Sequence, residues 1–222
     1  MSIRAVAVAG FAVAVALAAG SPALASETPP VTSPDVATDP IPVEPLDATL
    51  VIDGTPTDIA VMPDFDPRAP ALVLDSGGSP VAVHDIELVR GNGTRATVRL
   101  VDTTSRSALA GCSWYSWVAP GTGTWYGSVN GCSFIGLTAA TPVGYSWTVD
   151  ANSVGSACLK GRGYQYLTWP GGGGYSEFYG PIGCGSGGSA GGDSLPWGNV
   201  ASTKRLQMIS YSAPAGAAGM FQ

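Results

Sequence analysis

Short runs of alternating apolar and polar residues, broken by Gly, Pro, Asn and Asp, recur along most of this chain. A period of two is typical of β-strands with one buried face, since successive side chains point to opposite faces. No segment has a convincing helical stripe. In residues 200–209 the preceding Asn199 is a suitable cap for a short helix, but the alternation there favours a strand. The pattern therefore predicts an all-β fold, an antiparallel sandwich or barrel.

The clearest local prediction is a hairpin centred on Gly91-Asn92-Gly93, between strands at residues 86–90 and 95–101. The Asn-Gly step suits the positive φ angles of a tight turn. In the second strand apolar residues alternate with Arg and Thr, so this strand is expected to be half-buried. The residues predicted to face inward are Ala96, Val98 and Leu100.

The texture of the sequence changes at Gly111. Residues 48–110 hold short strand-like runs and predict a small β-strand region, whereas residues 111–211 predict a β domain rich in Cys, Gly and aromatic residues. Residues 212–222 are small and featureless, and they predict a flexible tail. Whether residues 48–110 form a separate domain is left open by these patterns.

The N-terminus has the pattern of an export signal, which we place at residues 1–25. Arg4 gives it a positive start, residues 5–19 are apolar, and an Ala-Leu-Ala cleavage site occupies residues 23–25. Because this apolar run is too short to span a bilayer comfortably, we expect a secreted, extracellular protein with no membrane insertion after cleavage. Residues 26–47 are rich in Pro and acids and predict a disordered linker.

Four cysteines, Cys112, Cys132, Cys158 and Cys184, stand 20, 26 and 26 residues apart, and the first half of the chain has none. In an oxidising environment an even number favours two disulfides over metal ligands, and three pairings exist. We favour 112–132 and 158–184, because each closes a short loop between expected neighbouring strands. Each would add about 3 kcal/mol through restriction of the unfolded chain. A crossed pairing would give the same sequence pattern.

Without the export signal the chain holds nine basic and sixteen acidic residues, a net charge of −7, and residues 112–222 carry only +1. Phosphate recognition needs a positive face, so nucleic acid is excluded as a partner. The single histidine, His84, has no second His or free thiol to join it, and neither a metal nor another cofactor is expected. Three acids lack the spacing of an EF-hand loop and are expected in solvated turns: Asp64, Asp66 and Asp75.

Several short strings resemble catalytic motifs but fail a physical test. Residues 75–79 match a chymotrypsin-like nucleophile loop, yet the sole histidine follows Ser76 instead of preceding it. Residues 183–191 match two glycine motifs without the helix or histidine that those motifs need. Glycoside hydrolysis needs two carboxylates across a cleft, for which Glu177 and Asp193 are a conceivable pair that nothing marks as buried. No catalytic residue is therefore assigned.

All six tryptophans follow residue 111. Trp and Tyr rings stack on sugars and pack on proteins, because they offer a large apolar area with little loss of entropy. Small β domains nevertheless bury most of their aromatic residues. Strand positions predicted to lie in the core are Trp114, Trp117, Trp147 and Tyr166. Positions in or near turns, and therefore predicted to meet a ligand, are Trp125, Tyr126, Trp169, Tyr175, Tyr179 and Trp197.

About a fifth of the chain resembles a known group of proteins. Residues 158–164 (CLKGRGY), 183–185 (GCG) and 196–200 (PWGNV) are similar to the C-terminal part of small, uncharacterised exported proteins of actinobacteria. The excess of Arg over Lys and the abundance of Ala, Gly, Val and Pro are typical of a GC-rich bacterial genome. The resemblance implies secretion and a paired Cys158 and Cys184, and it implies no functional assignment.

These patterns together predict a secreted, non-catalytic β-rich module that contacts a polysaccharide, the cell envelope or an extracellular protein through aromatic loops. The first alternative is a secreted inhibitor or antagonistic toxin-like interaction protein, which two disulfides and export would also suit. The second alternative is an extracellular hydrolase.

Overall fold

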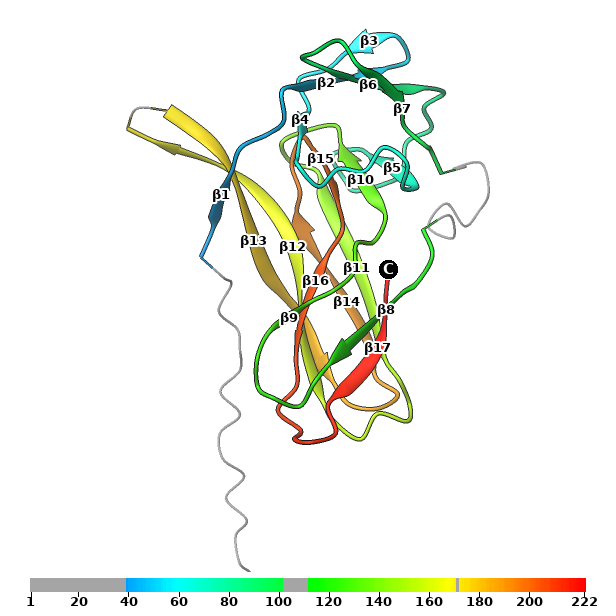
Figure 1. Ribbon diagram of the computed structural model, residues 1–222, viewed down its shortest axis with the longest axis vertical. Helices are drawn as coiled ribbons and strands as arrows, with labels where there is room; N and C mark the ends of the chain where they lie inside the picture. The colour runs from blue at the N-terminus through cyan, green and yellow to red at the C-terminus, as the bar shows by residue number, and fades with distance from the viewer. Residues whose placement is uncertain (1–38, 102–111, 171) are drawn as a thin grey trace, which may run out of the picture. The chain divides into compact units, whose positions relative to one another are not determined.

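A computed structural model describes residues 39–101, 112–170 and 172–222, and the predicted signal peptide lies outside these ranges. Within these ranges the chain forms strands and turns and no helix (Figure 1). The described residues therefore contain no helix that could cross a membrane. The predicted all-β fold, built mainly of antiparallel strands, is confirmed.

The described strands form four sheets, which we call A to D. In order across each sheet, A consists of β1 (Ile41–Val43), β13 (Gly172–Gly185), β12 (Ala157–Trp169), β16 (Leu206–Ile209) and β9 (Tyr126–Gly127). Sheet B consists of β3 (Thr55–Pro56), β2 (Ala48–Ile52), β6 (Ile86–Arg90) and β7 (Arg95–Thr97). Sheet C consists of β4 (Ala60–Val61), β15 (Val200–Thr203), β10 (Ser133–Gly136) and β5 (Ala71–Leu74). Sheet D consists of β14 (Ala190–Pro196), β11 (Pro142–Val149), β17 (Ala217–Phe221) and β8 (Tyr115–Ala119).

Sheet C joins the two halves of the chain. Its strands β4 and β5 come from the region before residue 110, and they pair in parallel with β15 and β10 respectively. Parallel neighbours need a long connection between them. Here the chain that connects each parallel pair contributes strands to the other sheets. Strands from residues 48–101 therefore share a sheet with strands from residues 112–211.

Sheet C is also a layer between two hydrophobic cores. Along β5, Leu72 and Leu74 belong to the core shared with sheets A and D, whereas Ala71 and Val73 belong to the core beneath sheet B. This alternation follows from the period of two in a strand. Because both faces are covered, β5 is a continuous apolar run.

The predicted hairpin is confirmed as β6 and β7. Its turn is closed by a hydrogen bond from the Gly93 amide to the Arg90 carbonyl, and Gly93 has a φ of +80°. Only Gly93 of the Asn-Gly step takes a positive φ, which is the arrangement of a hairpin with a bulge rather than a two-residue turn. Val98 is buried and Arg99 exposed, as the alternation predicts.

Both favoured disulfides are present, Cys112–Cys132 and Cys158–Cys184. Cys158 and Cys184 are directly opposed on β12 and β13, with Cα atoms 4.0 Å apart. Two disulfides suit an oxidising, extracellular-type environment.

The prediction of a flexible tail at residues 212–222 is wrong. Strand β17 lies inside sheet D between β11 and β8, and Phe221 is completely buried. The small residues that suggested a tail are needed for packing, because a Cβ at Gly219 would collide with the Thr148 carbonyl and the Trp117 ring.

Within the predicted linker, residues 26–47, the described part contains strand β1, which pairs with β13. The linker prediction is therefore wrong for Ile41–Val43. Pro42 is compatible with this strand because β1 is at the edge of sheet A, where a missing donor is tolerated. The segment 200–209, for which strand was favoured over helix, forms β15 and β16.

Candidate functional site

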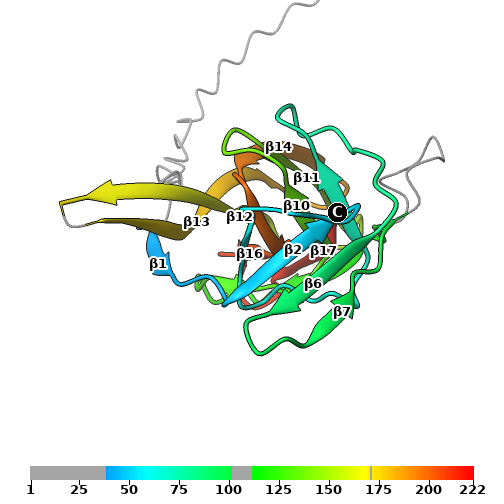
Figure 2. The same ribbon diagram turned by 90° about the horizontal axis from the view of Figure 1, so that it is seen from above.

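Strands β12 and β13 extend beyond the rest of sheet A. Strand β16 pairs with β12 only over Cys158–Gly161, and β1 pairs with β13 only over Tyr175–Glu177. Residues 165–170 and 172–175 consequently form a hairpin arm that projects from the sheet (Figures 1 and 2). We call these residues the aromatic arm.

The aromatic arm exposes two large rings. Tyr166 is 57 % exposed and Trp169 is 47 % exposed. Tyr166 is paired across the strands with Tyr175, their ring centroids are 5.2 Å apart in an edge-to-face contact, and the Tyr175 hydroxyl donates to Asn199 Oδ1 at 3.0 Å. Placing Tyr166 in the core was therefore wrong, because more than half of its surface is exposed.

Glycines of the arm make room for these rings. A Cβ on Gly173 would collide with the Tyr166 ring, and a Cβ on Gly174 would stand 3.0 Å from the Trp169 ring. Tyr166 and Trp169 are three positions apart on β12, so they face opposite sides of the arm. Each side of the arm thus presents one exposed aromatic ring next to a glycine.

Two of the predicted ligand-binding aromatics are buried instead. Trp197 is 0 % exposed, makes an edge contact with Tyr164 at 5.1 Å and donates from Nε1 to the Val200 carbonyl at 3.0 Å. Tyr179 is 8 % exposed, and burial raises the pKa of its phenol to about 12. Turn residues around position 197 indicated an exposed backbone, but they do not determine where the side chain points.

The remaining predicted aromatics lie at the other edge of sheet A. Trp125 and Tyr126 are half-buried; the Lys160 Nζ stands 4.5 Å from the Trp125 ring centroid, and the Tyr126 hydroxyl is 3.0 Å from that of Thr122. Trp169 and Tyr175 therefore lie on the same arm but on its opposite faces, and Trp125 and Tyr126 lie across the sheet. Of the predicted core tryptophans, Trp117 and Trp147 are buried and Trp114 is 41 % exposed.

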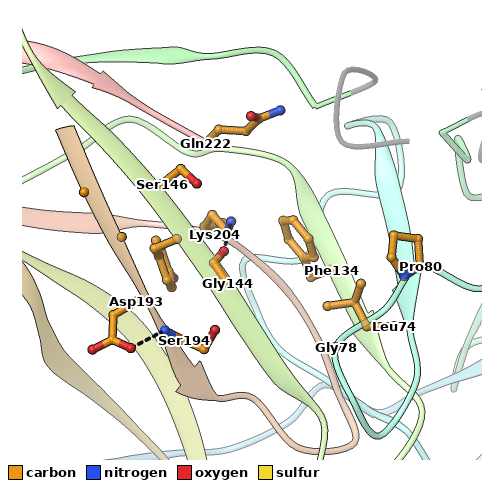
Figure 3. Close-up of a pocket in the computed structure, with 13 residues that line it drawn as sticks. Leu74, Gly78, Pro80, Phe134, Gly144, Ser146, Asp193, Ser194, Lys204 and Gln222 are labelled. Atoms are coloured by element: carbon orange, nitrogen blue, oxygen red, sulfur yellow. Dashed lines mark hydrogen bonds between the residues drawn. The ribbon is translucent and has the colours of Figure 1, made fainter. Parts of the chain in front are cut away.

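A cavity of about 500 Å³ lies where sheets C and D meet (Figure 3). Its walls come from β5, β10, β11 and β14, from the loop after β5, and from the segment between β15 and β16. The residues that line it are Leu74, Gly78, Pro80, Phe134, Gly144, Tyr145, Ser146, Gly191, Gly192, Asp193, Ser194, Lys204 and Gln222.

Lys204 is the buried charged residue of this cavity, with 3 % of its surface exposed. Its Nζ donates to the Gly144 carbonyl and stands 4.6 Å from the ring centroids of both Phe134 and Tyr145. No carboxylate of the described residues forms an ion pair with it. Burial lowers the pKa of the Lys204 amine to about 7. Sequence reasoning missed this residue, because its neighbours come from distant segments; the one available signal was that the chain has only two lysines.

Another buried cation, Arg162, is paired with carboxylates, although its Nε has no hydrogen-bond partner. Its guanidinium binds the carboxylates of Asp64 and Glu177, the latter at 3.3 Å, and donates to Ser202 Oγ at 3.2 Å. The conceivable catalytic pair is thus divided between two environments. Glu177 is held by Arg162, whereas Asp193 lies at the cavity and accepts a hydrogen bond from the Ser194 amide at 2.7 Å.

The acids considered for calcium have structural partners. Asp75 accepts hydrogen bonds from the amides of Gly77 and Ser79, and Asp66 accepts one from the amide of Arg68, as expected of acids in turns. Asp64 differs, because it pairs with the buried Arg162. The described residues contain no cluster of three or more potential metal ligands.

No protein-family model, curated protein or solved structure matches this chain. The fold and the two sites define it as a disulfide-linked all-β protein with an aromatic hairpin arm and a lysine-containing cavity.

Proposed function

We propose that this protein is a secreted, non-catalytic module that binds polysaccharide, such as that of a cell envelope, through its aromatic arm. The observation that carries the proposal is the exposure of Tyr166 and Trp169 on a projecting hairpin whose glycines make room for these rings. Sugar rings present apolar C–H faces that stack on aromatic rings, and a Tyr or Trp side chain loses little conformational entropy on binding.

The charge of the arm supports a neutral ligand. Residues 165–174 contain no Asp, Glu, Lys, Arg or His, so neither steering nor pairing of an ionic group is available there. Secretion belongs to the same proposal: the pattern of residues 1–25 would direct export, and the two disulfides would then form outside the cytoplasm.

A pull-down tests this function. The exported, disulfide-bonded protein is incubated with cellulose, chitin and purified bacterial cell wall, and its depletion from solution is measured. We expect binding to at least one glycan, with Trp169→Ala or Tyr166→Ala weakening it by about tenfold, the equivalent of 1.4 kcal/mol.

Tyr211→Ala is the matched control, because Tyr211 is 60 % exposed and lies outside the arm. Retention of binding in both arm variants, or no depletion by any glycan, would rule the proposal out.

A secreted inhibitor is the second candidate, supported by the single projecting hairpin with Cys158–Cys184 across its base. Inhibitors present one rigid loop to their target. Inhibition within a panel of extracellular proteases, lost after cleavage at the arm, would favour this candidate over glycan binding.

A further inference from the structure

The cavity between sheets C and D is separate from the aromatic arm and has the dimensions of a small-molecule site. Its volume of about 500 Å³ lies within the range of ligand-binding pockets. Hydrophobic walls from Leu74 and Phe134 are combined with polar residues, among them Ser146 and Ser194. A site of this kind takes a small, largely neutral molecule that carries a few polar groups.

Lys204 provides this cavity with an amine. The hydrogen bond to the Gly144 carbonyl and the flanking rings of Phe134 and Tyr145 fix the position of Nζ. A neutral lysine amine has two N–H groups and one lone pair, so donation to one carbonyl leaves the lone pair available. We infer that the cavity is a second binding site, in which Lys204 forms a reversible imine with a small aldehyde or ketone.

The reaction conserves every atom. The Nζ lone pair adds to the carbonyl carbon, a C–N bond forms, and the carbonyl π electrons move to oxygen, which takes up a proton. The resulting carbinolamine loses its hydroxyl group as water while nitrogen gives up its remaining proton, and the C=N bond forms. Addition of water reverses these steps. Nothing is oxidised or reduced, and desolvated lysines of proteins carry out this chemistry.

The groups around the amine favour a carbonyl compound over an anion. Asp193 lines the same cavity, so an anionic ligand would enter beside a carboxylate. Tyr145 packs against Nζ from β11, and burial raises the pKa of its phenol above the usual value, so it stays neutral. Tyr115 lines the small space on the other side of Lys204. Burial lowers the pKa of Lys204 to about 7, so much of the amine is unprotonated at neutral pH.

Reductive trapping tests the inference. The folded protein is incubated at pH 7.5 with glycolaldehyde and cyanoborohydride, and the modified residues are located by peptide mass spectrometry. Lys160 is an internal control, because it also lies over an aromatic ring but does not line this cavity. Lys160 is also buried, and burial lowers the pKa of its amine as well, but it does not line the cavity; we expect Lys204 to be labelled at least about tenfold faster than Lys160.

Two variants check the role of the cavity. Lys204→Met should abolish this adduct and leave that on Lys160. Gly144→Val should slow labelling of Lys204 alone, since a Cβ at Gly144 meets only Ser194 Oγ, at 3.8 Å, and is compatible with the fold. The inference would be overturned if Lys204 were labelled no faster than Lys160, or only in urea. It would also be overturned if acetate bound and protected Lys204 while glycolaldehyde formed no adduct with it. Wild-type labelling decides the matter even if a variant does not fold, and it is independent of glycan binding.

Discussion

Arg162 and Lys204 are both buried cations, and their surroundings compensate the charge in different ways. Arg162 binds two carboxylates, Asp64 and Glu177, which suits a guanidinium that stays charged at every accessible pH. Lys204 has two aromatic rings and one carbonyl around it. Rings and a carbonyl offset only part of the desolvation of an ammonium group. Of these two residues, Lys204 is therefore the one that can lose its proton under mild conditions.

This difference predicts how Lys204 changes stability with pH. Its pKa is about 7 in the folded protein against 10.5 for an ordinary lysine. Between these values the unfolded chain binds a proton that the folded protein lacks, so the Lys204 contribution to the free energy of unfolding rises with pH. Below pH 7 the Lys204 amine is protonated in both the folded and the unfolded state, so the full free-energy penalty of burying its charge remains. The difference between wild type and Lys204→Met should change by roughly 3–5 kcal/mol over this window.

Urea unfolding between pH 6 and 9.5 measures this change. The upper limit avoids ionisation of the phenols in the unfolded chain, because burial raises the folded pKa of Tyr145 and Tyr164 and their contribution to stability is lost above pH 10. Arg95→Met is the control, since the exposed Arg95 stays charged in both states. A constant difference between wild type and Lys204→Met across the range would contradict the burial of a titrating amine.

At the scale of the element, strand β17 is held by one large buried side chain. Phe221 is fully buried in the core shared with sheets A and D, and the neighbouring Met220 points outward with 42 % exposure. Phe221→Ala should therefore lower the free energy of unfolding by about 3–5 kcal/mol through the cavity it leaves. Met220→Ala should cost less than about 1 kcal/mol. Denaturant titration of both variants makes the comparison, and equal effects would mean that residues 217–221 are not a core strand.

The hairpin at Gly91–Gly93 and strand β17 show which elements a sequence can reveal. The hairpin depends on turn residues and an alternation within one short segment, so local chemistry was sufficient. Strand β17 has small residues because Trp117 and Thr148 leave no space beside Gly219, and that requirement comes from other strands. A segment rich in Ala and Gly looks the same whether it is a tail or a tightly packed strand.

The candidate site residues differ in the same way, since some follow from local sequence and others depend on distant contacts. Trp169 was predicted from its place before Pro170 in a turn, and it is exposed as expected. Trp197 has similar neighbours, but its ring enters the core beside Tyr164, which lies on a strand remote in sequence. Lys204 owes its character to Phe134, Gly144 and Tyr145, which are about 60 residues or more away in sequence. A local pattern cannot report burial that arises from such distant contacts.

At the scale of the whole molecule, sheet C connects two cores that would otherwise be separate. Strands β5, β10 and β15 each place alternate residues in the core with sheets A and D and in the core with sheet B. A layer buried on both sides transmits the loss of packing on one face to the other, because close-packed interiors have little room to relax. The described part of the chain should therefore unfold as one cooperative unit.

Leu88→Ala tests this coupling. Leu88 is 1 % exposed in the core with sheet B, whereas the buried tryptophans lie in the other core. Cavity formation should cost about 2–5 kcal/mol. If the cores are coupled, the unfolding midpoint seen by Trp fluorescence falls together with that seen by circular dichroism. Val118→Ala, at a position 65 % exposed on β8, should leave both unchanged. An unchanged Trp midpoint in Leu88→Ala, with two transitions in circular dichroism, would show that sheet C separates the cores energetically instead of joining them.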